Sequence, residues 1–211
     1  MIVKILIQNL QKTSNLASDL LEDKDPDVML AQEINLHSES GQDDFSASNV
    51  SSLGYGTAIV AHKSVRDENP TVTDVQRVDS PYAEFGGLIR KKTTIATVQG
   101  IRFVSFHGYN GTPFKSIEKL VAHVDAVLSV LSPSGPAVFA GDFNTWTEDH
   151  LEAVEKSLKR AGFRLVYSWP YPGRDFPLDH AFIRGELQVE SSSHYSCVSD
   201  HNGALLQLQL S

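Results

Sequence analysis

The chain has 211 residues, a single cysteine and a formal net charge of −8 at pH 7. This length suffices for one domain with a full hydrophobic core, and one cysteine excludes an intramolecular disulfide and fits a reducing compartment. The negative charge excludes a global basic field that would attract nucleic acid, although a bound cation or a local basic groove could offset it. The first residues read as a strand rather than a signal peptide, and no apolar run approaches a membrane span. We therefore expect one domain over residues 1–211 of a soluble, cytoplasmic protein.

Two stretches near the start of the chain combine an apolar strand pattern with a polar end. Residues 2–8 are apolar and β-branched, and predict a central strand that ends at Asn9. Residues 27–33 predict a second buried strand, with Glu33 at its end. Between them, leucines at helical spacing predict a helix with Thr13 as its N-cap.

A polar segment and a series of strand patterns follow. Residues 35–55 are rich in Ser, Asn, Asp and Gly, and predict a long, mobile surface loop. Apolar and β-branched stretches separated by Pro, Asp or Gly turns then predict further strands. These expected strands are residues 56–62, 71–78, 88–98 and 101–107. The last of them places His107 at a strand end.

The second half of the chain contains two helix patterns and the remaining strands. Apolar residues from Ile117 to Leu131 recur at helical spacing and predict an amphipathic helix that packs against a sheet. A second helix is expected at residues 148–161, closed by Gly162. The remaining expected strands are residues 136–142, 163–169, 179–184, 187–191 and 203–210. Helices mixed with many strands favour an α/β fold in which two sheets pack together between helices.

An acid and an amide directly follow the buried strand at residues 136–142. Asp142 and Asn144 are two residues apart, so in extended chain their side chains point the same way. A carboxylate and an amide oxygen together suit Mg²⁺, which takes few protein oxygens and keeps other positions for water and substrate phosphate. Taken alone, the motif is equally compatible with an Asx-turn that merely ends the strand.

Polar side chains occur at six predicted strand ends. They are Asn9, Glu33, His107, Asp142 with Asn144, Asp179 with His180, and Asp200 with His201. Their order along the chain resembles the endonuclease/exonuclease/phosphatase superfamily, with its pancreatic-deoxyribonuclease-like fold. The segments that carry the resemblance are Asn9, LAQE at 30–33, GDFN at 141–144, LDH at 178–180 and SDH at 199–201. The resemblance runs from the first strand to the last. It implies a four-layer α/β/β/α sandwich of two packed mixed sheets flanked by helices.

The resemblance also implies ligands and a general base. Glu33 is the expected main ligand of a Mg²⁺ or Mn²⁺ ion, with Asn9 and Asp200 as further metal ligands. Asp142 would orient or deprotonate the attacking water, and Asn144 would bind the scissile phosphate.

Two histidines complete the expected catalytic set. His201 would contact the phosphate or transfer a proton, and Asp179 would hold its ring. His107 falls where members of the superfamily place a second catalytic histidine or a tyrosine. Among the basic residues, Arg174 is the candidate for a substrate phosphate, whereas Lys91 and Lys92 are expected on a solvated strand face.

Other reactive residues receive no role. The remaining histidines are expected at the surface: His37, His62, His123, His150 and His194. Cys197 is not a candidate nucleophile, because the resemblance implies attack by water. A departure from many nucleases of the superfamily is Gln11, which stands where they carry an acid.

The implied activity is metal-dependent hydrolysis of phosphodiester bonds, with a nuclease favoured. A phosphatase or phosphodiesterase acting on a small-molecule or lipid phosphoester is the alternative, and the acidic charge mildly favours it. A non-catalytic phosphate-binding or interaction module is the second alternative. The expected partner is nucleic acid or another phosphoester substrate. The substrate, endo or exo cleavage, the number of metal ions and the oligomeric state stay open, and a monomer is compatible with the sequence.

Overall fold

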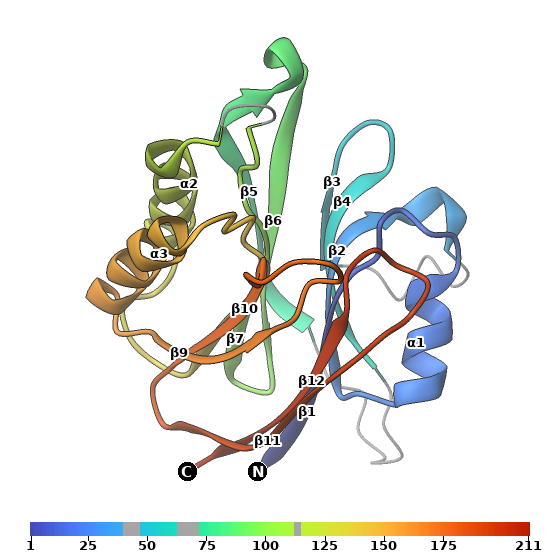
Figure 1. Ribbon diagram of the computed structural model, residues 1–211. Helices are drawn as coiled ribbons and strands as arrows, with labels where there is room; N and C mark the ends of the chain where they lie inside the picture. The colour runs from blue at the N-terminus through green and yellow to red at the C-terminus, as the bar shows by residue number, and fades with distance from the viewer. Residues whose placement is uncertain (40–46, 63–71, 112–114) are drawn as a thin grey trace.

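Two six-stranded sheets form the centre of the molecule (Figure 1). The computed structural model describes residues 1–39, 47–62, 72–111 and 115–211. Within these ranges, helix α1 lies on the outer side of one sheet and helices α2 and α3 lie on the outer side of the other. The predicted four-layer α/β sandwich is therefore confirmed.

The first sheet joins both ends of the described chain. In spatial order, its strands are β11 (Leu187–Tyr195), β12 (Gly203–Leu210), β1 (Ile2–Asn9), β2 (Val28–Asn35), β4 (Tyr55–Ala61) and β3 (Ala47–Val50). β1 and β2 are parallel, whereas the other neighbours are antiparallel. Because β1 and β2 run the same way, Asn9 and Glu33 come to the same edge of the sheet.

The second sheet repeats this arrangement around a second parallel pair. In spatial order, its strands are β5 (Val72–Glu84), β6 (Ile89–Val98), β7 (Ile101–His107), β8 (Ala137–Asp142), β10 (Asp179–Arg184) and β9 (Arg164–Trp169). β7 and β8 are parallel, and the register pairs His107 with Asp142. β10 is antiparallel to β8 and pairs Asp179 with Asp142, so its first residue reaches the same edge.

The helices are crossovers that bury one apolar face. Helix α1 (Leu16–Lys24) connects β1 to β2, and its leucines pack on the outer face of that sheet. Helix α2 (Ile117–Leu128) connects β7 to β8, and α3 (Glu148–Arg160) follows β8. Both cover an aromatic cluster that includes Phe106 and Phe139. No helix in the described ranges is long and apolar enough to cross a membrane.

Buried polar side chains join the two sheets beneath the edge where these strands end. The Gln32 amide donates to Ser105 Oγ at 2.9 Å, and Ser105 Oγ donates to the Ala31 carbonyl at 2.8 Å. One step away, Thr94 Oγ1 donates to the Thr57 carbonyl at 2.9 Å. Buried polar groups need partners, so these contacts favour one alignment of the two sheets. They hold the end of β2, which carries Glu33, against β7.

Two sequence predictions in the first quarter of the chain were wrong. Helix α1 begins at Leu16 and follows Asn15, so Thr13 is not its N-cap. The expected loop at residues 35–55 contains strand β3, whose Asn49 amide donates to the Thr93 carbonyl of the other sheet at 3.1 Å. A polar composition concealed this strand because the polar side chain is used inside the molecule. Residues 40–46 of the expected mobile loop lie outside the described residues.

Two edge strands are longer than the sequence predicted. β5 was expected at residues 71–78, but it continues to Glu84, and Thr71 lies outside the described residues. β11 was expected to end at Ser191, but it continues to Tyr195. Most side chains in both extensions are exposed or half-buried, so they lack the apolar alternation by which strands are identified.

Candidate active site

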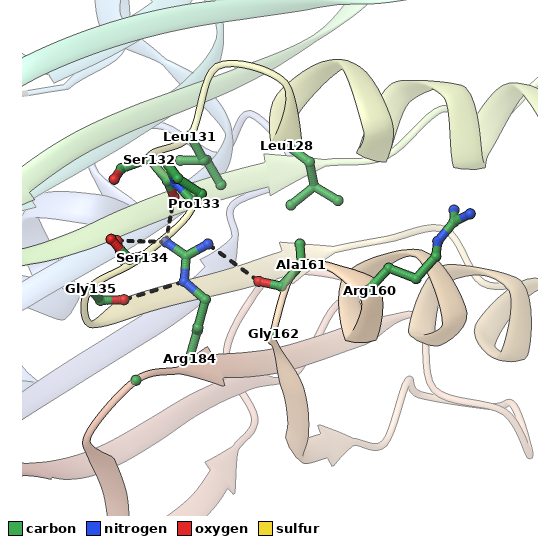
Figure 2. A pocket seen from close by; sticks show the side chains of 11 residues that line it. Leu128, Leu131, Ser132, Pro133, Ser134, Gly135, Arg160, Ala161, Gly162 and Arg184 are labelled. Atoms are coloured by element: carbon green, nitrogen blue, oxygen red, sulfur yellow. Dashed lines mark hydrogen bonds between the residues drawn. The ribbon is translucent and has the colours of Figure 1, made fainter.

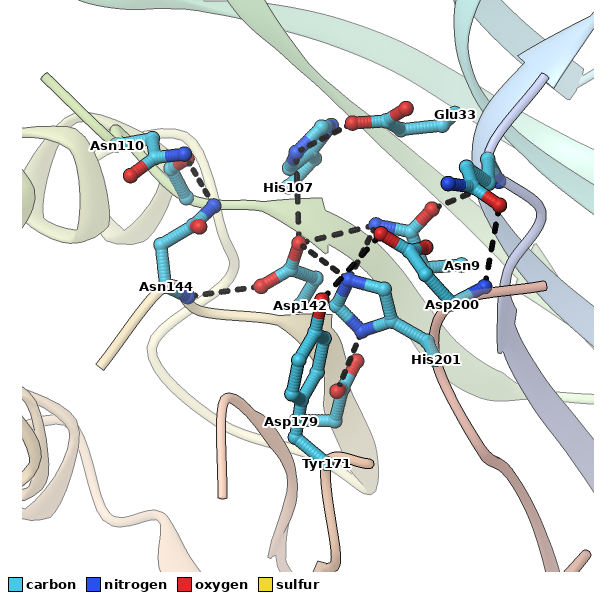
Figure 3. A network of polar contacts seen from close by, with 12 residues as sticks. Asn9, Glu33, His107, Asn110, Asp142, Asn144, Tyr171, Asp179, Asp200 and His201 are labelled. Atoms are coloured by element: carbon cyan, nitrogen blue, oxygen red, sulfur yellow. Dashed lines mark hydrogen bonds and ion pairs between the residues drawn. The ribbon is translucent and has the colours of Figure 1, made fainter. Parts of the chain in front are cut away.

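Strand ends from both sheets bring six of the predicted site residues into one network (Figure 3). The residues are Asn9, Glu33, His107, Asp142, Asp179 and His201, and each has a polar contact with another member. Five of them stand at or near strand ends, whereas His201 lies in the connection between β11 and β12. In α/β sheets, ligands bind outside the carboxyl ends of parallel strands, so this edge is the natural place for a site.

Asp142 is the buried centre of the network. Gly141 before it has φ 138°, and a Cβ atom there would lie 2.2 Å from the Phe106 carbonyl oxygen, so only glycine lets β8 approach β7 this closely. Asp142 Oδ1 accepts from the Asn144 backbone N–H at 2.9 Å, and Oδ2 accepts from the Asn9 amide at 3.0 Å. Burial raises the pKa of Asp142, and the positive charges of His201 and Lys91 oppose that rise. A fixed carboxylate with a raised pKa is suited to accept a proton.

His201 is a cation held between two carboxylates. Its Nδ1–H donates to Asp179 Oδ2 at 2.7 Å, and its Nε2 lies 3.7 Å from Asp142 Oδ2. Burial disfavours the imidazolium, but Asp179 and Asp142 outweigh this cost and raise the pKa of His201 to about 9. Burial also raises the pKa of Asp179, against the influence of His201. The Tyr171 ring packs edge-on against the imidazole, with the ring centres 4.7 Å apart.

Asn144 connects the loops that follow β7 and β8. It has the left-handed φ of 55°, uncommon outside glycine, so the chain turns directly after β8 and is not extended at Asn144. Its side-chain amide donates to the Gly108 carbonyl at 3.0 Å. The predicted contact of Asn144 with the scissile phosphate stays a prediction.

Glu33 is presented to the site by a β-bulge. The pairing of β2 with β4 shifts register between Gln32 and Ile34, and Glu33 has a φ of 50°. Bulges beside active sites re-aim a side chain. Glu33 Oε2 accepts from Lys12 Nζ at 2.9 Å, and its side chain is 20% exposed. This carboxylate is more accessible than Asp142 or Asp179.

His107 is neutral and belongs to a contact that the sequence interpretation missed. Lys91 Nζ donates to His107 Nε2 at 2.7 Å. Burial, followed by the Lys91 charge, lowers the pKa of His107 well below its usual value. The distances of 3.6 Å to Glu33 and 3.5 Å to Asp142 are therefore not ion pairs. The expectation that Lys91 lies on a solvated face was wrong, because the side chain turns toward the end of β7.

Asp200 and Arg174 lie outside the buried part of the network. Asp200 is exposed, and its Oδ2 accepts from the Tyr171 hydroxyl at 3.3 Å. Its backbone N–H donates to Gln11 Oε1 at 3.1 Å. Arg174 places its guanidinium 4.0 Å from the centre of the Trp146 ring. Tyr171 and Trp146 are absent from the sequence prediction, since aromatic residues in a proline-rich loop or after a GDFN motif carry no distinctive spacing.

Three further histidines are buried and serve packing. His180 lies between Thr145 Oγ1 at 2.6 Å and Ser168 Oγ at 2.7 Å, and burial lowers its pKa to about 3. His123 packs against Phe106, and burial lowers its pKa to about 3 as well. The prediction that His123 and His150 are surface residues was wrong, because they lie on the buried faces of helices α2 and α3, respectively.

The donor set near Glu33 fits a hard cation that retains water and substrate ligands. In the described ranges, no group of three or more His, Cys, Asp or Glu side chains is arranged to hold a metal ion. Mg²⁺ does not need one, since it is commonly bound by one or two carboxylates together with substrate phosphate. The Glu33 carboxylate and the Asn9 side-chain oxygen are the donors suited to it, and the latter accepts from the Gln11 N–H at 3.0 Å.

A separate cavity at the other end of β10 has no such chemistry (Figure 2). It measures about 550 Å³ and lies between the ends of α2 and α3. Arg184, the only charged side chain pointing across it in Figure 2, donates to the carbonyls of Ser132, Gly135 and Ala161. Arg184 thus joins the loop between α2 and β8 to the end of α3, and these contacts are structural.

The fold is an α/β sandwich of the phosphoesterase type. A sequence profile of the Endonuclease/Exonuclease/phosphatase family matches residues 7–201, and the chain belongs to this family. Members are typically metal-dependent phosphoester hydrolases. The match includes the strand-end residues from Asn9 to His201.

Curated relatives match over much of this chain but extend beyond it. A UPF0294 protein of Vibrio parahaemolyticus is 27% identical over 164 residues, which are 75% of this chain and 57% of the relative. A UPF0294 protein of Vibrio campbellii is also 27% identical, over 75% of this chain and 56% of its own length. The chain thus covers little more than half the length of these relatives.

Solved structures share the fold at low sequence identity. An endonuclease/exonuclease/phosphatase from Beutenbergia cavernae has a TM-score of 0.73 at 14% identity, over 99% of this chain and 72% of that chain. D. rerio TDP2 complexed with a single-strand DNA product has a TM-score of 0.65 at 16% identity, over 99% of both chains. These likenesses establish the architecture independently of the sequence motifs.

Proposed function

We propose that this protein is a Mg²⁺- or Mn²⁺-dependent phosphodiesterase that uses water as the nucleophile, and that its substrate is nucleic acid. The observation that carries the proposal is the buried His201, 2.7 Å from Asp179 and 3.7 Å from Asp142, at the edge where Glu33 is accessible. Hydrolysis of a phosphodiester needs a base for water and positive charge around the phosphate. This edge contains both.

The acid and base roles follow from the charges of the buried groups. Asp142 has a raised pKa and contacts both His107 and His201, so it is the residue to orient water and take its proton. His201 carries a proton that it can share with a phosphate oxygen, and Asp179 holds its ring. Asp179 is a positioning residue, because it acts through its hydrogen bond to His201.

The remaining residues bind and orient. Glu33 and Asn9 would hold the metal ion, with Asp200 as a further ligand, and the ion when bound would supply Lewis-acid charge at the phosphate. Lys91 keeps a positive charge at the His107 end of the site, and the neutral His107 accepts its hydrogen bond. Asn144 would contact the scissile phosphate from the loop after β8.

A nuclease is favoured over a phosphatase by the structural relatives. D. rerio TDP2 is solved with a single-strand DNA product, and another relative is the endonuclease domain of TRAS1, with a TM-score of 0.65 at 18% identity. The net charge of −8 limits nonspecific attraction to nucleic acid, so we expect modest affinity and a shallow salt dependence. A monoester or lipid phosphoester substrate is the alternative.

The test is a substrate panel with and without metal. The purified protein is assayed with single-stranded DNA, duplex DNA, RNA, a small phosphodiester and a phosphomonoester, in EDTA and then in excess Mg²⁺ or Mn²⁺. We expect diester cleavage that EDTA abolishes and either ion restores, and that Asp142→Asn removes. Full activity after dialysis against EDTA would contradict the metal mechanism. Robust monoester hydrolysis without diester cleavage would replace the nuclease by the phosphatase.

A further inference from the structure

Three loops from the site edge converge on the indole ring of Trp146. Trp146 follows Asn144 by two residues, and its Nε1–H donates to Asn110 Oδ1, beyond β7, at 2.9 Å. Lys115 Nζ lies 4.0 Å from the ring centre and also donates to Asn110 Oδ1. The Arg174 guanidinium, from the loop between β9 and β10, lies 4.0 Å from the same ring centre.

Two positive charges on one ring are unusual in a protein of net charge −8. Cations over an aromatic face gain attraction from the ring, but like charges brought together repel. Burial lowers the pKa of Lys115, the Glu84 carboxylate opposes this shift, and the charges of Lys91 and Arg174 add to it. Within the described part of the chain, Arg174 forms no ion pair with a carboxylate. An anion between these loops would relieve the repulsion.

The position of this cluster relates it to the reacting phosphate. Asn110 and Asn144 lie at one end of the polar network and Glu33 lies at the other, with His107 and Asp142 between them (Figure 3). The Trp146 cluster therefore adjoins the site on the side away from Glu33. A substrate that has a single phosphate group would not need it.

We infer that Arg174 and Lys115, seated on Trp146, form a subsite for a second phosphate group, the one next to the scissile phosphate in a phosphodiester chain. The inference rests on the proposed function and refines it: the substrate is an oligonucleotide rather than a lone phosphoester. Arg174 supplies a planar donor group, which suits a phosphate oxygen pair. Trp146 acts as the support that orients it.

The test removes one charge at a time, either that of a substrate phosphate or that of Arg174. Single-stranded oligonucleotides in which one methylphosphonate replaces each phosphate in turn are compared with the natural strand. For the wild type, neutralising the neighbouring phosphate should lower kcat/KM about tenfold, the scale of one charge-assisted contact. Arg174→Gln should lose about as much on the natural strand and show no further loss on the neutral one. Trp146→Leu should behave like Arg174→Gln because the guanidinium loses its seat.

Controls separate this inference from the proposed function. Arg160→Gln removes an exposed arginine at the far end of α3 and should match the wild type. Diester cleavage that is insensitive to both methylphosphonate and Arg174→Gln would overturn the subsite and leave the phosphodiesterase intact. If the wild type cleaves no diester with metal, the proposed function fails. Fluorescence anisotropy of labelled strands then tests the subsite by affinity. If the methylphosphonate leaves the affinity of the wild type unchanged, the subsite is overturned. If it lowers the affinity of the wild type but not that of Arg174→Gln, the subsite is supported.

Discussion

Two of the three Asp-His dipeptides in the chain, at 179–180 and 200–201, contribute opposite members to the site. In the first, Asp179 enters the site, and His180 points away to bind Thr145 and Ser168. In the second, His201 enters the site, whereas Asp200 is exposed and accepts from Tyr171. The working pair is thus formed across the two dipeptides.

The comparison shows that the surroundings of a buried histidine decide whether it is charged. His201 faces carboxylates, which raise its pKa to about 9 although it is buried. The hydrogen-bond partners of His180 are hydroxyl groups, so burial alone acts and lowers its pKa to about 3. Asp179 and His180 are adjacent residues of β10 and therefore point to opposite sides of the strand, so this dipeptide supplies only one member to the site.

The largest expected effect is on turnover and distinguishes the two histidines. His201→Gln keeps a donor for Asp179 but removes the charge, and should lower kcat by about two orders of magnitude or more, the usual scale for an acid–base group. His180→Gln can still bond to both hydroxyls and should keep kcat within about threefold, or about 0.7 kcal/mol. Steady-state kinetics on the substrate identified by the panel measures both.

The control is His194→Gln, an exposed histidine on β11. Circular dichroism and thermal unfolding of all three variants separate lost chemistry from lost folding. Near-normal turnover in His201→Gln, with the protein folded, would remove His201 from the chemistry. A collapse of turnover in folded His180→Gln would erase the distinction between the two dipeptides.

The next effect is on stability, and here the residue concerned is His180 rather than His201. The folded-state pKa of His180, about 3, lies below its ordinary value of 6.5. As pH falls below 6.5 the unfolded chain binds a proton that the folded protein excludes, so stability is lost down to about pH 3. At about pH 4.5 this costs roughly 3 kcal/mol. Relative to His180→Gln, the wild type should lose this much between about pH 8 and 4.5 in urea unfolding.

His123 offers an independent version of the same measurement. His123 lies on the buried face of helix α2, and burial lowers its pKa to about 3 as well. His123→Gln should show a similar relative loss. Equal pH dependence of the wild type and both variants would mean that these histidines titrate normally in the folded protein.

Much of the architecture could be predicted from strand patterns and strand ends. Apolar runs such as those of β1, β2 and β8 identify buried strands, and polar residues directly after them must gather where parallel strands end. This reasoning identified Asn9, Glu33 and Asp142 as strand-end residues, and the family resemblance implied that they share one site. Edge strand β3 escaped, because its Asn49 is buried by bonding across to the other sheet.

The site contacts that the sequence did not predict join segments that are far apart in the chain. Lys91 lies in mid-strand β6 and became a site neighbour only because its side chain reaches the end of β7. Tyr171 and Trp146 act through ring contacts with His201 and Arg174. No periodicity or spacing in the sequence encodes such contacts, because each depends on how two separate segments of the chain are placed by the fold.

An intermediate effect is expected from the positioning carboxylate. Asp179→Asn keeps a polar group beside His201 but removes the main charge that favours imidazolium. The pKa of His201 should fall from about 9 toward its ordinary value of 6.5, which NMR titration of the metal-free protein measures. We expect kcat to drop about tenfold, less than for His201→Gln, because the imidazole remains. A larger loss than His201→Gln would place Asp179 in the chemistry itself.

The smallest effect is expected at Asp200, and it decides between two roles for this carboxylate. The family resemblance makes Asp200 a metal ligand, whereas the geometry shows an exposed carboxylate that accepts from Tyr171 at 3.3 Å. If Asp200 only orients Tyr171, Asp200→Asn should change kcat and the Mg²⁺ concentration for half-maximal activity by about threefold or less, and Tyr171→Phe should match it. Glu33→Gln is the reference, since losing the main ligand charge should raise that Mg²⁺ concentration about tenfold or more. If Asp200→Asn shifts the Mg²⁺ dependence as far as Glu33→Gln while Tyr171→Phe does not, Asp200 binds the ion directly.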